Sequence, residues 1–261
     1  TISFSSSSFI IPKTFNKQLK NKKILKISRR SKYLIFHFRE AILLIHLGMT
    51  GKLLVQKITN NKLFKTSFYY NLNIISKHNH IYFILDNGFM LVYNDVRRFG
   101  FLKLYNHTKI NKINHIQKLG LEPLNRRFNL IYFKQFIKGR KKNIKNLLMD
   151  QTFVSGLGNI YVNEVLFMSK VNPSRFCNNL SNIEIKCLVK NIKKILRHSI
   201  LKGGSSIRDF KNTHGKSGSF QQFFYVYGKK NVKCSRYSCK GMIKKIFISS
   251  RSSFYCNYCQ I

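Results

Sequence analysis

Residues 251–260 read RSSFYCNYCQ, and this stretch contains Cys256 and Cys259 with two residues between them. A second close pair, Cys234 and Cys239, lies upstream with four residues between its members. Thiolates grouped in this way converge on one tetrahedral zinc ion, which folds a segment that is too small for a hydrophobic core of its own. The sequence therefore predicts one structural Zn²⁺ and a C-terminal zinc finger on a hairpin over residues 225–261.

The region around these cysteines carries positive charge only, since residues 210–261 contain no Asp or Glu. The whole chain has 48 Lys and Arg against 8 Asp and Glu, a formal net charge of +40. A field of this sign favours a polyanionic partner. Enrichment in Lys, Asn, Ile, Phe and Tyr is typical of an AT-rich genome and explains part of the excess. A ribosomal protein and a protein of an anionic membrane surface are the competing interpretations.

The bulk composition sets limits on the class of protein. A chain of 261 residues with 44% hydrophobic residues is long enough for two domains and a small appendage, and it is not globally disordered. The longest apolar run, Ile42 to Leu47, is far shorter than the roughly 20 residues that cross a bilayer. We expect no membrane association and no secretory signal, hence a cytoplasmic location in which cysteines bind metal rather than form disulfides. Cys177 and Cys187 stand apart and are expected to be small buried side chains.

The first part of the chain, residues 1–118, has the pattern of β-structure. Apolar and aromatic runs occupy residues 32–38, 42–47, 81–85 and 89–93. The last two runs flank Asp86-Asn87-Gly88, and Asn-Gly supplies the positive φ angles of a tight hairpin turn. Short strands with turns between them predict a sandwich or a barrel.

Residues 119–220 have helical character instead. Ser181 and Glu184 form a capping box at the start of a helix, and Gly203 and Gly204 end it. Its apolar positions recur at helical spacing: Ile185, Leu188, Val189, Ile192, Ile195, Leu196 and Ile200. An earlier helix is expected from about Asn159, and residues 211–219 are expected to form a loop.

Two further tracts have residue types that suit nucleic acid. Residues 94–100, NDVRRFG, place two guanidinium groups and an aromatic ring just after a strand. Arginine pairs with base edges or phosphates, and phenylalanine wedges between bases. Residues 154–161, VSGLGNIY, form a glycine-bearing turn before a helix, where free backbone N–H groups attract phosphate. Each tract taken alone is weak, because exposed arginine pairs and glycine turns are common.

Taken in order, these tracts resemble the formamidopyrimidine-DNA glycosylase family over nearly the whole chain. The matching stretches are SRRSKYL (28–34), IHLGMTG (45–51), DVRRFG (95–100), LGLEPL (119–124), LMDQ (148–151), GLGNIY (156–161), VYGK (226–229) and the C-terminal RSSFYCNYCQ. The resemblance implies an α+β fold with an N-terminal β-sandwich, a helix-two-turns-helix domain and a C-terminal zinc-finger β-hairpin, with DNA between the two domains. It also implies a function: removal of oxidised purines in base-excision repair.

The resemblance assigns DNA-binding roles to six residues. Met49, Arg97 and Phe99 match the side chains that fill the space left by a flipped-out nucleotide: two apolar groups replace the lost stacking, and a guanidinium satisfies the orphaned base. Core packing is the alternative for Met49. Phosphate contacts are expected from His78, Lys141 and Asn159, and a helix cap is the alternative for Asn159.

Two residues receive catalytic roles from the same resemblance. Lys32 matches the family lysine near the abasic sugar, and Arg251 matches the zinc-finger arginine that contacts phosphate and bears on the last elimination step. The family nucleophile is an N-terminal proline, followed by a glutamate that acts as the acid. Neither is present here, since Thr1 aligns after the family's first helix and Glu40 is the first acidic residue. We therefore expect the chain to be truncated or wrongly started, and inactive as given although the complete product is a glycosylase and lyase.

Three alternatives to this activity stay open. The first is a relative that holds damaged DNA without catalysis, and the second is a glycosylase for oxidised pyrimidines. The third, independent of the family, is a basic zinc-ribbon protein that binds ribosomal RNA. In the favoured interpretation the partner is damaged double-stranded DNA, and the protein is a monomer associated with a bacterial nucleoid.

Overall fold

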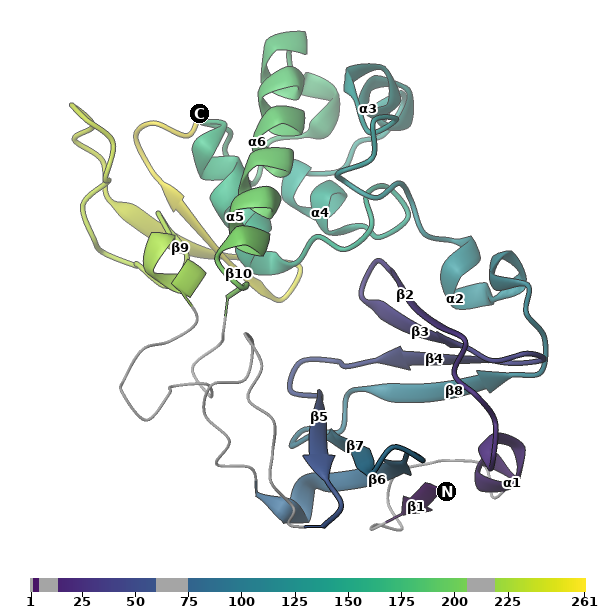
Figure 1. The fold of residues 1–261 in the computed structure, drawn as a ribbon. Helices are drawn as coiled ribbons and strands as arrows, with labels where there is room; N and C mark the ends of the chain where they lie inside the picture. The colour runs from purple at the N-terminus through teal and green to yellow at the C-terminus, as the bar shows by residue number, and fades with distance from the viewer. Residues whose placement is uncertain (1, 5–13, 60–74, 206–218) are drawn as a thin grey trace. The chain divides into compact units, whose positions relative to one another are not determined.

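The computed structural model describes residues 2–4, 14–59, 75–205 and 219–261 (Figure 1). The chain divides into two compact units, Thr1–Gln117 and Lys118–Ile261. The loop expected at residues 211–219 lies outside the described residues except for Ser219, which begins helix η4 (Ser219–Phe223). A separate third domain over residues 225–261 stays a prediction.

The first unit contains two four-stranded antiparallel sheets that sandwich an apolar core (Figure 1). One sheet has the order β1 (Ile2–Phe4), β6 (Asn79–Ile84), β7 (Phe89–Asn94), β5 (Lys52–Lys57). The other has the order β2 (Lys26–Arg30), β3 (Tyr33–His37), β4 (Ile42–His46), β8 (Phe101–Tyr105). The smaller elements of this unit are α1 (Phe15–Leu19), η1 (Ser76–His78), η2 (Ile110–Lys112) and α2 (Asn114–Gln117). The strands expected from the apolar runs are confirmed, and the architecture is the sandwich.

The turn between β6 and β7 differs in detail from the sequence expectation. Gly88 adopts a positive φ of 78°, whereas Asn87 is not in the left-handed region. The N–H of Leu85 donates to the carbonyl of Phe89 at 2.9 Å, so three residues form the loop. A loop of this length combines an ordinary turn with a single left-handed residue. The glycine supplies that residue, and the asparagine accepts a hydrogen bond from the N–H of Phe89 at 3.3 Å instead.

The second unit is built on helices. They are α3 (Leu130–Ile137), α4 (Ile144–Met149), α5 (Asn159–Met168), η3 (Cys177–Asn179) and α6 (Asn182–Leu201). Both halves of the capping box are present at Ser181 and Glu184, and Gly203 and Gly204 take positive φ angles just after α6. The apolar face of α6 enters the core of this unit, but Ile200 in its last turn is 65% exposed.

The C-terminal hairpin, β9 (Ile243–Ile248) and β10 (Arg251–Cys256), belongs to this second unit and lies beside α5 (Figure 1). Its apolar residues pack with Phe167 of α5 in a small cluster that includes Cys234 and Cys256. No helix in the described ranges is long and apolar enough to span a bilayer.

The two isolated cysteines have different environments. Cys177 is fully buried, as expected, but Cys187 is exposed. The expectation for Cys187 was wrong because the buried side of α6 is set by Ile185 and Leu188, and residue 187 points away from that side.

Candidate nucleic-acid interface and metal centre

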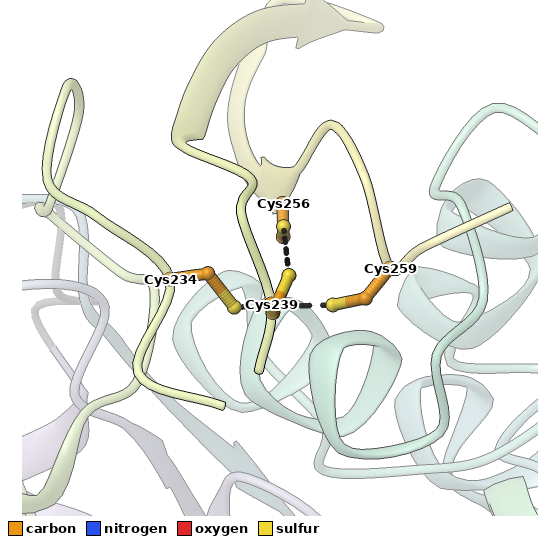
Figure 2. A group of neighbouring side chains, drawn as sticks. All are labelled: Cys234, Cys239, Cys256 and Cys259. Atoms are coloured by element: carbon orange, nitrogen blue, oxygen red, sulfur yellow. Dashed lines mark hydrogen bonds between the residues drawn. The ribbon is translucent and has the colours of Figure 1, made fainter. Parts of the chain in front are cut away.

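The four cysteines predicted to bind metal come together at the base of the C-terminal hairpin (Figure 2). Their sulfur atoms all lie within 4.8 Å of one another, with 3.9 Å between Cys234 and Cys259 and 3.6 Å between Cys239 and Cys256. A tetrahedral zinc with Zn–S bonds of about 2.3 Å requires sulfur separations of roughly 3.8 Å. The geometry of the thiols therefore fits a structural zinc ion.

The local backbone prepares this site for a cation. A Cβ atom at Gly241 would lie 2.5 Å from the Cys256 sulfur, so only glycine fits beside the thiol. Burial raises the pKa of Cys234 and of Cys259, whereas at Cys256 the N–H groups of Cys259 and Tyr258 that point at the sulfur outweigh burial and lower its pKa. Ser238 takes a positive φ of 59°, which turns the chain so that Cys239 reaches the others despite the wider spacing of this pair.

Arg251 lies exposed at the start of β10, next to a tight turn. Ser249 and Ser250 form that turn, with φ angles of 47° and 60°. Two consecutive left-handed residues match the twist of a two-residue hairpin. The turn is tied to α4, because the Asn146 side-chain amide donates to the Ser249 hydroxyl at 2.8 Å.

Lys145 of α4 supports the backbone beneath Arg251. Its side chain is buried, and its Nζ donates to the Ser252 carbonyl at 2.8 Å and to the Ser253 hydroxyl at 2.7 Å. A longer contact of 3.4 Å reaches the carbonyl of Arg251 itself. Burial, together with the charge of Arg251, lowers the pKa of Lys145 to about 8. The hairpin is thus held by a buried amine in addition to the cysteine cluster.

Asn159 supports the same strand from α5. The N-cap residue of α5 is Gly158, so the prediction that Asn159 could be a helix cap is wrong. The Asn159 side-chain amide donates instead to the Ser252 carbonyl at 3.0 Å. One turn further along, the Asn163 side-chain oxygen accepts from the N–H of Phe254 at 2.6 Å. The buried Glu164 carboxylate accepts from the N–H groups of residues 225–227. Side chains of α5 therefore form a row of hydrogen bonds to the backbone of the finger, called the polar seam below.

The three residues predicted to fill a vacated nucleotide site lie together in the first unit. Met49 and Phe99 are each 56% exposed, so Met49 is not core packing. The Arg97 guanidinium donates to the Met49 sulfur at 3.5 Å and lies over the Phe99 ring, 4.5 Å from its centroid. Two apolar side chains and a cation thus form one exposed group, called the probe cluster below.

Close backbone packing brings the two loops of the probe cluster together. Gly48 has a positive φ of 63°, and a Cβ there would lie 2.6 Å from the N–H nitrogen of Gly100. A Cβ at Gly100 would collide with the Tyr93 hydroxyl and would lie 2.6 Å from the His46 carbonyl. These glycines are required because any side chain would push residues 48–51 away from residues 95–100.

The remaining predicted residues lie on separate elements. Lys32 is exposed in the β2–β3 turn, where its charge adds to burial in lowering the pKa of His46. His78 is half-buried at the end of η1, and its carbonyl accepts from the N–H of Asp95 at 3.0 Å. Lys141 is exposed between α3 and α4, beside Lys142, which pairs with Asp150 at 2.8 Å.

Two family models match the chain in succession. Residues 3–102 match the formamidopyrimidine-DNA glycosylase N-terminal domain, and residues 119–211 match the formamidopyrimidine-DNA glycosylase H2TH domain. The formamidopyrimidine-DNA glycosylase of Bartonella tribocorum is 39% identical over 265 residues, which cover 97% of this chain and 88% of that protein. The chain belongs to the formamidopyrimidine-DNA glycosylase family.

Other glycosylases of this family are similar in sequence and in structure. That of Rickettsia bellii is 38% identical over 93% of this chain and 84% of its own length. The structure of Lactococcus lactis Fpg with an abasic site containing DNA has a TM-score of 0.84 and 33% identity, covering 100% of this chain and 91% of the other. A mutant of that protein with a Fapy-dG containing DNA gives a TM-score of 0.83 at 33% identity, over 98% and 89% of the two chains. The α+β fold with its Cys₄ finger is that of these glycosylases.

Five residues around these sites were not identified from the sequence. They are Thr50, Asp95, Lys145, Asn163 and Glu164. Lys145 has the clearest sequence signal, a cation in a short helix whose other residues are apolar except for Asn146. Asp95 and Thr50 lie inside the matched motifs, but an aspartate or threonine next to arginine and phenylalanine carries no sequence signal of its own for contact with bases.

Proposed function

We propose that this protein is a base-excision repair glycosylase that removes oxidised purines from double-stranded DNA. The proposal rests on family membership and, in the structure, on one observation above all: Met49, Arg97 and Phe99 form an exposed cluster with mutual contacts. Single exposed apolar side chains are common on protein surfaces, but apolar side chains that group together beside a charge are typical of an interaction site. A duplex with a vacated base position is a partner that suits them.

The probe cluster suits the energetics of base flipping. Extruding a nucleotide costs a few kcal/mol of stacking and pairing, and less where the base is damaged. In this proposal Met49 and Phe99 replace the lost stacking, and Arg97 donates to the base left without a partner. His78, Lys141, Asn159 and Arg251 contact the phosphates, which hold the duplex in register without reading its sequence.

The finger supplies rigidity to Arg251. The four sulfur atoms are spaced for one zinc ion, which when bound would lock the two halves of the finger together. We expect one zinc per chain on metal analysis of the purified protein. Replacing all four cysteines by serine should abolish zinc binding and weaken binding to lesion-bearing duplex. Full retention of that binding without zinc would contradict the role given to the finger.

The chemistry of base release and strand cleavage needs an amine. Attack of a neutral amine on the anomeric carbon breaks the bond to the damaged base and leaves a Schiff base. Loss of the adjacent sugar proton then cleaves the strand by β-elimination, and a second elimination releases the sugar. A terminal α-amine with a pKa of roughly 8 is a better nucleophile near neutral pH than a lysine at about 10.4. Lys32 is proposed to act near the abasic sugar, and Arg251 in the last elimination.

Borohydride trapping tests this lyase chemistry, because reduction fixes the Schiff base as a covalent adduct. The 261-residue chain and a form extended at its N-terminus by an added Pro-Glu segment should be compared on duplex that contains 8-oxoguanine. We expect an adduct and strand nicking with the extended form. Tight lesion binding without an adduct in either form would favour the relative that only holds damaged DNA. Activity on oxidised pyrimidines alone would favour the other glycosylase class.

The assembly and location follow from the same proposal. A protein that acts on single lesions in duplex DNA needs one copy per site, so we propose a monomer working on the nucleoid of a bacterium. Analytical ultracentrifugation of the protein with a lesion-bearing duplex should give one protein per duplex. A stable two-to-one complex on a short duplex would contradict this stoichiometry.

A further inference from the structure

A buried carboxylate lies between the two loops that carry the probe cluster. Asp95 follows strand β7 and has no exposed surface. Burying a charged carboxylate is costly unless several hydrogen bonds replace its water shell. The hydrogen-bond partners of Asp95 therefore show which parts of the chain the buried carboxylate holds in place.

The carboxylate accepts hydrogen bonds from three different segments. Its Oδ1 accepts from the Thr50 hydroxyl at 2.5 Å, on the loop that carries Met49. Its Oδ2 accepts from the N–H of Gly100 at 2.9 Å, at the far end of the loop that carries Arg97 and Phe99. Oδ2 also accepts from the Tyr93 hydroxyl at 3.0 Å, which anchors the whole arrangement to β7.

Thr50 relays the connection to Arg97. The hydroxyl that donates to Asp95 also accepts from the backbone N–H of Arg97 at 3.1 Å. Thr50 thus joins the two loops directly, and Asp95 fixes the orientation of the shared hydroxyl. The main chain of Asp95 adds two more bonds: its N–H donates to the carbonyl of His78 at 3.0 Å, and its carbonyl lies 2.8 Å from the Nε2 of the buried His80.

The hydrogen bonds favour the ionised form of Asp95. Burial acts to raise the pKa of Asp95, but the hydrogen bonds from Thr50, the Gly100 N–H and Tyr93 outweigh it and lower the pKa. An asparagine would place an NH₂ group where donors already point, so at least one donor would lose its acceptor. The site therefore requires an acceptor at both oxygens.

We propose that Asp95 is the positioning residue that holds Met49, Arg97 and Phe99 as one preformed group. It acts through Thr50 and Gly100 and does not itself reach the surface. What the preformed group does depends on the proposed function, whereas the arrangement itself does not. Preformed side chains bind more tightly because less conformational freedom is lost on binding.

A single tryptophan makes this arrangement measurable, since the chain contains none. With Phe99→Trp as the background, the fluorescence anisotropy of the introduced indole in the free protein reports the mobility of the probe cluster. Quenching of this fluorescence by duplex with a stable abasic analogue reports insertion. Adding Asp95→Asn should lower the anisotropy and reduce the quenching at saturation. We expect affinity for this duplex to fall about tenfold to a hundredfold.

Two controls separate positioning from general damage. Asp150→Asn removes a carboxylate that accepts from Thr152 and Lys142 in the second unit, and it should leave the indole signals unchanged. Thr50→Val deletes the relaying hydroxyl, whereas Thr50→Ser keeps it. The valine variant should lower the indole anisotropy as Asp95→Asn does, and the serine variant should match the background protein.

The outcomes are distinct. Unchanged indole anisotropy in a folded Asp95→Asn protein would overturn the positioning role. If Asp95→Asn does not fold, the Thr50 pair decides, and equal anisotropy in its valine and serine variants would overturn the inference. If Phe99→Trp protein and the unmodified chain bind lesion-bearing and undamaged duplex equally, the proposed function fails. The anisotropy of the free protein would still test Asp95 in that case.

Discussion

At the scale of single residues, the structure uses buried polar side chains to place exposed ones. Lys145 is the clearest example in the second unit, because its amine donates hydrogen bonds to the Ser252 carbonyl and the Ser253 hydroxyl beneath Arg251. A buried amine without those acceptors would lose its proton or move to solvent. These hydrogen bonds therefore favour one position of the backbone at the start of β10. Arg251, which precedes Ser252, is held in one place as a result.

Replacing Lys145 by methionine tests this support. Methionine keeps much of the side-chain volume but donates no hydrogen bond, so the buried acceptors of β10 lose a partner. We expect a loss of about 1–3 kcal/mol in the free energy of unfolding. Urea denaturation measures it, with Lys134→Met on the exposed side of α3 as the control, expected within about 0.5 kcal/mol of the parent. Equal stability of the two variants would contradict the supporting role.

The depressed pKa of Lys145 also predicts a pH dependence. Its folded-state pKa of about 8 lies below the roughly 10.4 of an unfolded lysine. Between these values the unfolded chain binds more protons, so the contribution of Lys145 to stability rises with pH across this window. The stability of the parent relative to Lys145→Met should therefore increase between about pH 8 and pH 10. Denaturation curves at several pH values measure it, and a flat difference would contradict the shift.

At the scale of secondary structure, the sequence predicted elements better than it predicted their contacts. The strands of the sandwich, the start of α5 and the capping box of α6 follow from local patterns of apolar and capping residues. The three-residue turn at Gly88 and the exposure of Cys187 depend on geometry that those patterns do not specify. The polar seam of α5 with the finger joins residues far apart in the chain, such as Asn163 and Phe254, and no local pattern reports contacts of that range.

The seam itself can be tested at Asn163. Asn163→Ala leaves the buried N–H of Phe254 without an acceptor, which costs about 1–3 kcal/mol. Asn182→Ala, at an exposed position in α6, is the matched control and should change stability little. Hydrogen exchange of the β10 amides gives a local measurement, with faster exchange expected in Asn163→Ala only. Unchanged protection of β10 would show that the cysteine cluster holds the hairpin without help from α5.

At the scale of the whole molecule, charge and family membership point the same way. A net charge of +40 has the sign that suits phosphate. The family match covers 97% of the chain at 39% identity, so the candidate residues of both units occur in one contiguous framework. The proposed roles of single residues could be predicted from motifs, because those motifs are short and ordered. The buried hydrogen bonds that hold these residues in place could not be predicted in this way, because they join segments that are distant in the sequence.

The charge predicts a steep salt dependence of DNA binding. With roughly six phosphate contacts, affinity should fall about a thousandfold between about 50 and 200 mM salt. Arg251→Gln should reduce the slope of log affinity against log salt by about one contact. Titrations at several salt concentrations measure both slopes, and identical slopes for the two proteins would remove Arg251 from the phosphate-binding set.

Lesion recognition by the probe cluster is the central claim, and the ratio of two affinities tests it most directly. Binding of the chain to a duplex with a stable abasic analogue should be compared with binding to the undamaged duplex of the same sequence, at one salt concentration. We predict at least about tenfold tighter binding to the lesion, corresponding to about 1.4 kcal/mol, and loss of this preference when Met49, Arg97 and Phe99 are all replaced by alanine. Equal affinity of the unmodified chain for the two duplexes would contradict the account.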